Sequence, residues 1–115
     1  MRRFAKQLIG PALIDEFGDP DDPQDWKFLA GISAYHAAAT GKTYPPILIA
    51  TSRRDDRAHP GHARKMAAKL RTMGYQAYFY EPATGGHALG NDHFDHATHM
   101  SLAYGFLRRA IGWQQ

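Results

Sequence analysis

The fold of this chain is decided by residues 47–57, which read ILIATSRRDDR. Residues 47–51 form an apolar, partly β-branched run, and such a run is typical of a strand that is buried on both faces in a parallel sheet. Two carboxylates and an arginine follow at residues 55–57. The stretch therefore predicts a buried strand that delivers charged side chains to one edge of a sheet.

The chain after this strand alternates between helix and strand. Pro60 opens a predicted helix whose apolar residues recur every three or four positions, and Gly74 ends it in the usual C-terminal place. Residues 75–80 predict a second strand, and residues 92–111 predict a last helix. This order predicts an α/β fold with parallel strands and a right-handed crossover, as one βαβα unit over residues 46–115.

Residues 1–45 predict a lead-in of short helices and loops. Apolar residues at helical spacing favour a helix within residues 3–14, although the Gly-Pro pair that ends at Pro11 should break or offset it. Asp22 is an N-cap candidate followed by a proline, and it predicts a helix over residues 23–33. With 115 residues, the chain forms one domain at most.

The composition is that of an ordinary globular protein and excludes several functions. No apolar run approaches the roughly 18 residues needed to span a membrane, and no apolar segment of a secretory signal follows the basic start of the chain. The net charge of +3 is dispersed, which argues against nucleic-acid binding. The absence of cysteine excludes disulfides, cysteine-bound zinc and thiol catalysis. We expect a cytoplasmic protein without membrane or nucleic-acid partners.

Polar side chains follow both predicted strands. Asp55, Asp56 and Arg57 come after the first strand, and His87 comes after the second, behind two glycines that permit positive φ. Because the carboxyl ends of parallel strands share one edge, both loops lie where open α/β folds bind ligands. A carboxylate that accepts the Nδ1 proton of a histidine orients it as a general base. Spacing alone leaves two interpretations open, an acid–base pair or unrelated surface residues.

The same residues carry a resemblance to a known family. Residues 44–65 contain the pattern DDR-x-x-P-x-H-x-x-K, and residues 85–87 read GGH. Together with residues 16–20 and 33–36, they closely resemble the C-terminal part of the catalytic domain of prolyl oligopeptidase family serine peptidases. The resemblance extends over nearly the whole chain. It implies a partial α/β-hydrolase fold and hydrolysis of peptide bonds, without a cofactor.

The resemblance also implies roles for individual residues. Asp55 corresponds to the acid of a catalytic triad, and His87 corresponds to its base. Arg57 corresponds to an arginine that helps to hold the backbone carbonyl of a peptide substrate. Asp56 is expected to be a structural neighbour of the triad.

The chain departs from the family at the nucleophile, which the family presents in a GxSxG turn that exposes the serine oxygen. None of its serines, Ser33, Ser52 and Ser101, has glycines at that spacing, and Ser52 at the strand end is expected to be merely hydrogen-bonded. The resemblance thus implies that a missing N-terminal portion of the hydrolase domain supplies the serine, and that the isolated chain is inactive. The alternative is a catalytically inactive remnant that acts as a small oligomeric or partner-binding module.

The last helix carries histidines and apolar residues. His93, His96 and His99 follow one another at a spacing of three, so two neighbours could share a metal but all three could not easily do so. We interpret them, like His59 and His62, as a polar surface and expect no metal site. The aromatic residues of the last strand and helix suit the core of a complete hydrolase domain. Two strands alone leave edges and apolar faces uncovered, which predicts a homo-oligomer.

Overall fold

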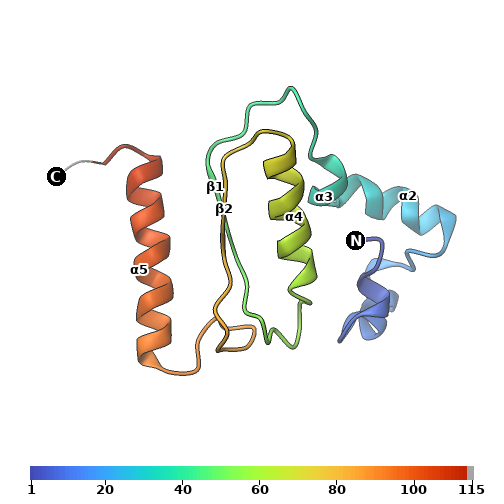
Figure 1. The fold of residues 1–115 in the computed structure, drawn as a ribbon. Helices are drawn as coiled ribbons and strands as arrows, with labels where there is room; N and C mark the ends of the chain where they lie inside the picture. The colour runs from blue at the N-terminus through green and yellow to red at the C-terminus, as the bar shows by residue number, and fades with distance from the viewer. Residues whose placement is uncertain (114–115) are drawn as a thin grey trace.

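Two parallel strands and the helix that connects them form the centre of the molecule (Figure 1). The structure is a computed structural model that describes residues 1–113. Its elements, in chain order, are the 3-10 helices η1 (Phe4–Lys6) and η2 (Gly10–Leu13), then α1 (Ile14–Phe17), α2 (Pro23–Ile32), α3 (Ala34–Ala37), β1 (Ile47–Ala50), α4 (Gly61–Thr72), β2 (Ala77–Tyr80) and α5 (His93–Ala110). The last two residues of the predicted βαβα unit, 114–115, lie outside the described part.

Strands β1 and β2 pair in parallel, with Ile47 opposite Ala77 and Ala50 opposite Tyr80. The pairing continues beyond the strands, because the N–H of Arg53 donates to the carbonyl of Pro82 at 3.1 Å. The two loops therefore leave the sheet side by side at one edge. The parallel α/β arrangement predicted from the sequence is confirmed.

Helix α4 covers one side of the strands and carries the core (Figure 1). Leu70 from α4, Ala77 from β2 and Ala38 from the lead-in are buried together. Tyr44 and Met66 pack against this cluster. The core therefore holds α4 against the sheet and fixes where the loops at the ends of β1 and β2 begin.

Gly74 ends α4 as the sequence predicts. Its φ is +86°, its N–H donates to the carbonyl of Arg71 at 2.9 Å, and the N–H of Tyr75 donates to the carbonyl of Leu70 at 3.0 Å. This pair of bonds is the Schellman arrangement that satisfies the last carbonyls of a helix. It also uses the N–H of Tyr75, so β2 begins at Ala77 and not at residue 75.

The lead-in is more broken than the helical spacing of residues 3–14 suggests. Two 3-10 turns and the short α1 replace one helix, because the chain folds back at Gly10. A Cβ at Gly10 would lie 1.7 Å from the carbonyl oxygen of Phe4, and the next residue, Pro11, has no N–H to continue a helix.

Helix α2 follows its sequence signals closely. It begins at Pro23, and the carboxylate of Asp22 accepts the N–H groups of Gln24 and Asp25 at 2.7 and 3.2 Å. Proline has no backbone N–H, and at the first helical position an N–H would have no acceptor within the helix. The predicted N-cap is therefore confirmed.

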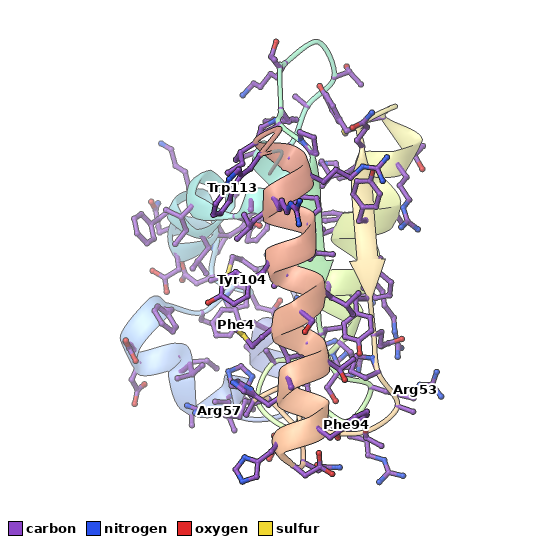
Figure 2. The ribbon with its side chains drawn as sticks, turned by 90° about the vertical axis from the view of Figure 1, so that its left-hand side faces the viewer. Phe4, Arg53, Arg57, Phe94, Tyr104 and Trp113 are labelled. Atoms are coloured by element: carbon purple, nitrogen blue, oxygen red, sulfur yellow. The ribbon has the colours of Figure 1, made fainter. Side chains whose placement is uncertain are left out.

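Helix α5 lies on the other side of the strands from α4 (Figure 1). None of its residues is buried, and a groove of about 590 Å³ separates part of it from the sheet. Phe94 and Tyr104 project from α5 in Figure 2, with exposed fractions of 81% and 63%. The apolar residues that suit a complete hydrolase core are thus largely uncovered here. No helix within residues 1–113 has the length and apolar character required to cross a membrane.

Candidate active site

The loops after β1 and β2 bring a carboxylate and an imidazole together. His87 Nδ1 lies 3.1 Å from both carboxylate oxygens of Asp55. The side chain of Asp55 is only 7% exposed, whereas that of His87 is 50% exposed. The pair therefore consists of a buried acid and an imidazole that solvent or a substrate can reach. The structure brings together the two residues whose pairing the sequence left open.

Main-chain groups of its own loop hold Asp55 in place, in addition to the contact with His87. Its Oδ1 accepts the N–H groups of Arg57 and Ala58 at 3.0 and 2.8 Å. Its N–H donates to the carbonyl of Ser52 at 3.2 Å. An aspartate that accepts main-chain N–H groups two and three residues ahead forms a tight local turn. The carboxylate is consequently held in one orientation toward His87.

These bonds also set the charge of the acid. Burial alone raises the pKa of Asp55, but the N–H groups of Ala58 and Arg57 and the adjacent His87 outweigh burial and hold that pKa below its ordinary value. Asp55 is therefore ionised at neutral pH and can only accept hydrogen bonds. The Nδ1 of His87 must then carry the proton, which leaves Nε2 of the neutral ring as the basic nitrogen.

The loop that holds His87 depends on one of its two glycines. Gly85 has φ +83°, and a Cβ there would lie 2.7 Å from the backbone nitrogen of Gly90. A Cβ at Gly86 would meet only Asp56 Oδ1 at 3.5 Å, which is an ordinary contact. The sequence interpretation that these glycines permit positive φ is therefore right for Gly85, whereas Gly86 has no positive φ.

Ser52 joins the two loops. It is fully buried, and its hydroxyl donates to the carbonyl of Gly85, with the carbonyl of Thr84 also within 3.2 Å. The same oxygen accepts the N–H of Arg54 at 3.2 Å. The sequence correctly predicts that Ser52 is hydrogen-bonded. The sequence does not predict the bond from Ser52 to the loop of His87. Its only signal is that Ser52 follows a predicted strand directly.

Arg57 and Asp56 are both exposed. Within residues 1–113, the Arg57 guanidinium has no hydrogen-bond or ion-pair partner. Figure 2 shows Arg57 and Arg53 at the same end of the molecule, on opposite sides of α5 in that view. A guanidinium without a partner, two residues after a buried acid, is available to a ligand at the same edge.

The remaining histidines do not gather around a common point. In the described part of the chain, no three histidine or carboxylate side chains lie close enough to hold a metal ion. The ring of His99 stacks on Tyr80 with centroids 6.0 Å apart, and His59 Nδ1 accepts the N–H of Gly61 at 3.0 Å. These two histidines thus have local partners.

Comparison with known proteins identifies the family to which the chain belongs. The sequence profile described as "Prolyl oligopeptidase family" matches residues 2–114. The chain belongs to the prolyl oligopeptidase family. It is 41% identical over 107 residues to an uncharacterized peptidase of Sinorhizobium fredii, which covers 93% of this chain and 15% of that relative.

Solved structures of the family match the fold closely. A post-proline cleaving enzyme from Rickettsia typhi superposes with a TM-score of 0.91 at 28% identity, over 97% of this chain and 16% of that enzyme. Prolyl oligopeptidase B from Galerina marginata, bound to a 35mer hydrolysis and macrocyclization substrate, superposes with a TM-score of 0.84 at 25% identity. This match covers 97% of this chain and 16% of that protein. The predicted partial α/β-hydrolase fold and the resemblance to this family are therefore confirmed. The chain spans only about one sixth of these relatives.

Proposed function

We propose that this chain is the C-terminal segment of a prolyl-oligopeptidase-like serine peptidase, in which Asp55 is the acid and His87 the base of a catalytic triad. The observation that carries this proposal is the 3.1 Å contact between a buried, ionised carboxylate and an accessible imidazole. Both side chains follow parallel strands, at the edge where open α/β folds place their ligands. The family to which the chain belongs makes peptides the natural substrate class.

The pair would act on a serine hydroxyl that this chain does not supply in a GxSxG turn. Nε2 of His87 would take the serine proton as the serine oxygen attacks a peptide carbonyl, and would later return that proton to the leaving amine. The imidazolium formed in between would be stabilised by Asp55 through Nδ1–H. The relatives extend well beyond the matched segment, so a longer hydrolase domain is the proposed source of the serine.

An exchange chimera tests this function. The chimera places residues 1–115 in the Rickettsia typhi post-proline cleaving enzyme instead of the matching segment of that enzyme. We expect it to cleave a peptide after proline and to react with a fluorophosphonate probe, whereas the isolated chain does neither. A chimera that is folded, as judged by a cooperative melting transition, yet inert in both assays would contradict the proposal.

Arg57 is proposed to hold the carbonyl oxygen of the peptide substrate, because it follows the acid by two residues and its exposed guanidinium has no partner within residues 1–113. In the exchange chimera, Arg57→Ala should lower kcat/KM by about ten- to a hundredfold, as expected when a hydrogen bond from a charged donor is lost. Arg53→Ala is the matched control, since Arg53 is an exposed arginine of the same loop. Equal effects of the two substitutions on peptide cleavage would rule out a specific role for Arg57.

A second candidate function, a small oligomeric module, is favoured by the uncovered face of α5. Its apolar residues include Tyr104, 63% exposed, and Leu107, 51% exposed. We expect the isolated chain to self-associate through α5 at micromolar concentration, as measured by light scattering. Tyr104→Glu should shift it toward the monomer, and Phe28→Glu, at an equally exposed position on α2, should not. A monomer for the unmodified chain would refute self-association.

A further inference from the structure

We propose that Ser52 is a positioning residue for the acid–base pair, because it fastens the loop of Asp55 to the loop of His87. The inference rests on the proposed function, since the orientation of the pair affects a rate only if the pair is catalytic. Ser52 itself does not touch the imidazole. Its role is to set the distance between the two loops at the point where each turns toward the site.

Ser52 contacts both loops through different atoms. Its hydroxyl donates to the carbonyl of Gly85, two residues before His87, and lies 3.2 Å from the carbonyl of Thr84. Its own carbonyl accepts the N–H of Asp55 at 3.2 Å. One buried residue is therefore bonded to the chain on each side of the acid–base contact.

Few other bonds hold these loops together. The last main-chain bond between them, in the described part of the chain, is the 3.1 Å bond from Arg53 to Pro82. Beyond it, within residues 1–113, the only hydrogen bonds between the loops are those of the Ser52 hydroxyl and the contact of Asp55 with His87. Without the hydroxyl, the Asp55–His87 contact would be the one hydrogen bond that joins the two loops beyond Arg53 and Pro82, within residues 1–113.

Burial makes it unfavourable for a water molecule to replace the Ser52 hydroxyl. The side chain is 0% exposed, and Gly85 is buried as well. A buried carbonyl that loses its donor has to move toward another partner or remain unsatisfied. Gly85 has little space around its Cα, with a Cβ position only 2.7 Å from Gly90, so movement of its carbonyl should also shift His87, two residues further along the chain.

Nitrogen NMR of the 115-residue chain tests the inference without any activity. In ¹⁵N-histidine-labelled protein, the shifts of Nδ1 and Nε2 report which nitrogen of neutral His87 carries the proton. Ser52→Ala should move these shifts at least halfway toward those of Asp55→Asn, in which the charged acceptor is lost. Ser33→Ala is the matched control, since Ser33 is 3% exposed but bonds to His36 Nδ1 at 2.8 Å. Wild-type His87 shifts in a folded Ser52→Ala variant would overturn the inference.

Kinetics of the exchange chimera give a second readout. Ser52→Ala should lower kcat about tenfold and leave KM unchanged, because misplacing a catalytic group slows the chemical step. Ser33→Ala should change neither constant. If Ser52→Ala does not fold, Ser52→Cys retains a weak donor of similar size and should move the His87 shifts partway, and unchanged shifts would again overturn the inference.

The two readouts separate this inference from the proposed function. An inert but folded chimera, combined with displaced His87 shifts in Ser52→Ala, would reject the triad and retain Ser52 as the residue that orients His87. An active chimera in which Ser52→Ala has wild-type kcat and wild-type shifts would retain the triad and reject the role of Ser52.

Discussion

His87→Ala is expected to abolish peptide cleavage by the exchange chimera, with a fall in kcat of about 10⁴-fold or more. The imidazole is the only group at the described site that is both accessible and bonded to a buried carboxylate. Without it, nothing removes the proton of the attacking serine. Initial rates on a chromogenic peptide with proline before the scissile bond measure the effect.

The control for this substitution is His93→Ala. His93 is an exposed histidine at the start of α5, so its replacement changes the same atoms at a position outside the proposed site. We expect full activity in this variant and unchanged melting temperatures in both. A His87→Ala chimera that still cleaves at the rate of the His93→Ala chimera would exclude His87 as the base.

Asp55→Asn is expected to have the next largest effect, a fall in kcat of about 10⁴-fold. An asparagine keeps the shape of the side chain but has no charge to stabilise the imidazolium. Its NH₂ group can also face Nδ1, which would place the ring proton on Nε2, the nitrogen that has to act as the base. The expected change therefore appears in kcat much more than in KM.

The neighbouring carboxylate provides the matched control for Asp55→Asn. Asp56 is exposed, and its Oδ1 lies 3.5 Å from the position that a Cβ at Gly86 would take. Asp56→Asn removes the same charge one residue away, and we expect activity within about twofold of the unmodified chimera, as for a surface substitution. Similar losses in both variants would mean that general charge near the site, and not the bonded acid, supports catalysis.

Much of the fold could be predicted because its signals are local. The strand β1, the cap at Asp22 and the helix end at Gly74 each depend on signals between nearby residues, and the structure confirms all three elements. The prediction that β1 is buried is wrong, because its residues are only half-buried in a sheet of two strands. The lead-in was predicted less well. The break at Gly10 depends on its approach to the carbonyl of Phe4, six residues away, which no periodicity records.

The sequence predicts which residues lie at the candidate site, but it does not predict the hydrogen bond that joins the two loops of the site. Asp55 and His87 follow strands that topology places at one edge, so their proximity could be expected. The bond from Ser52 to Gly85 connects positions 33 residues apart and requires the register of the two loops. The uncovered apolar face of α5 follows from the sequence as well, because two strands cannot cover it, and no residue of α5 is buried in the structure.

The most direct test of the account is the rate at which a fluorophosphonate probe labels the serine of the exchange chimera. That rate depends on removal of the serine proton and does not require peptide binding. We predict rapid labelling of the chimera and a rate at least about a hundredfold lower in the folded His87→Ala variant, in line with the contribution of a general base. Labelling of that variant at the rate of the unmodified chimera would contradict the assignment of Asp55 and His87 as a catalytic pair.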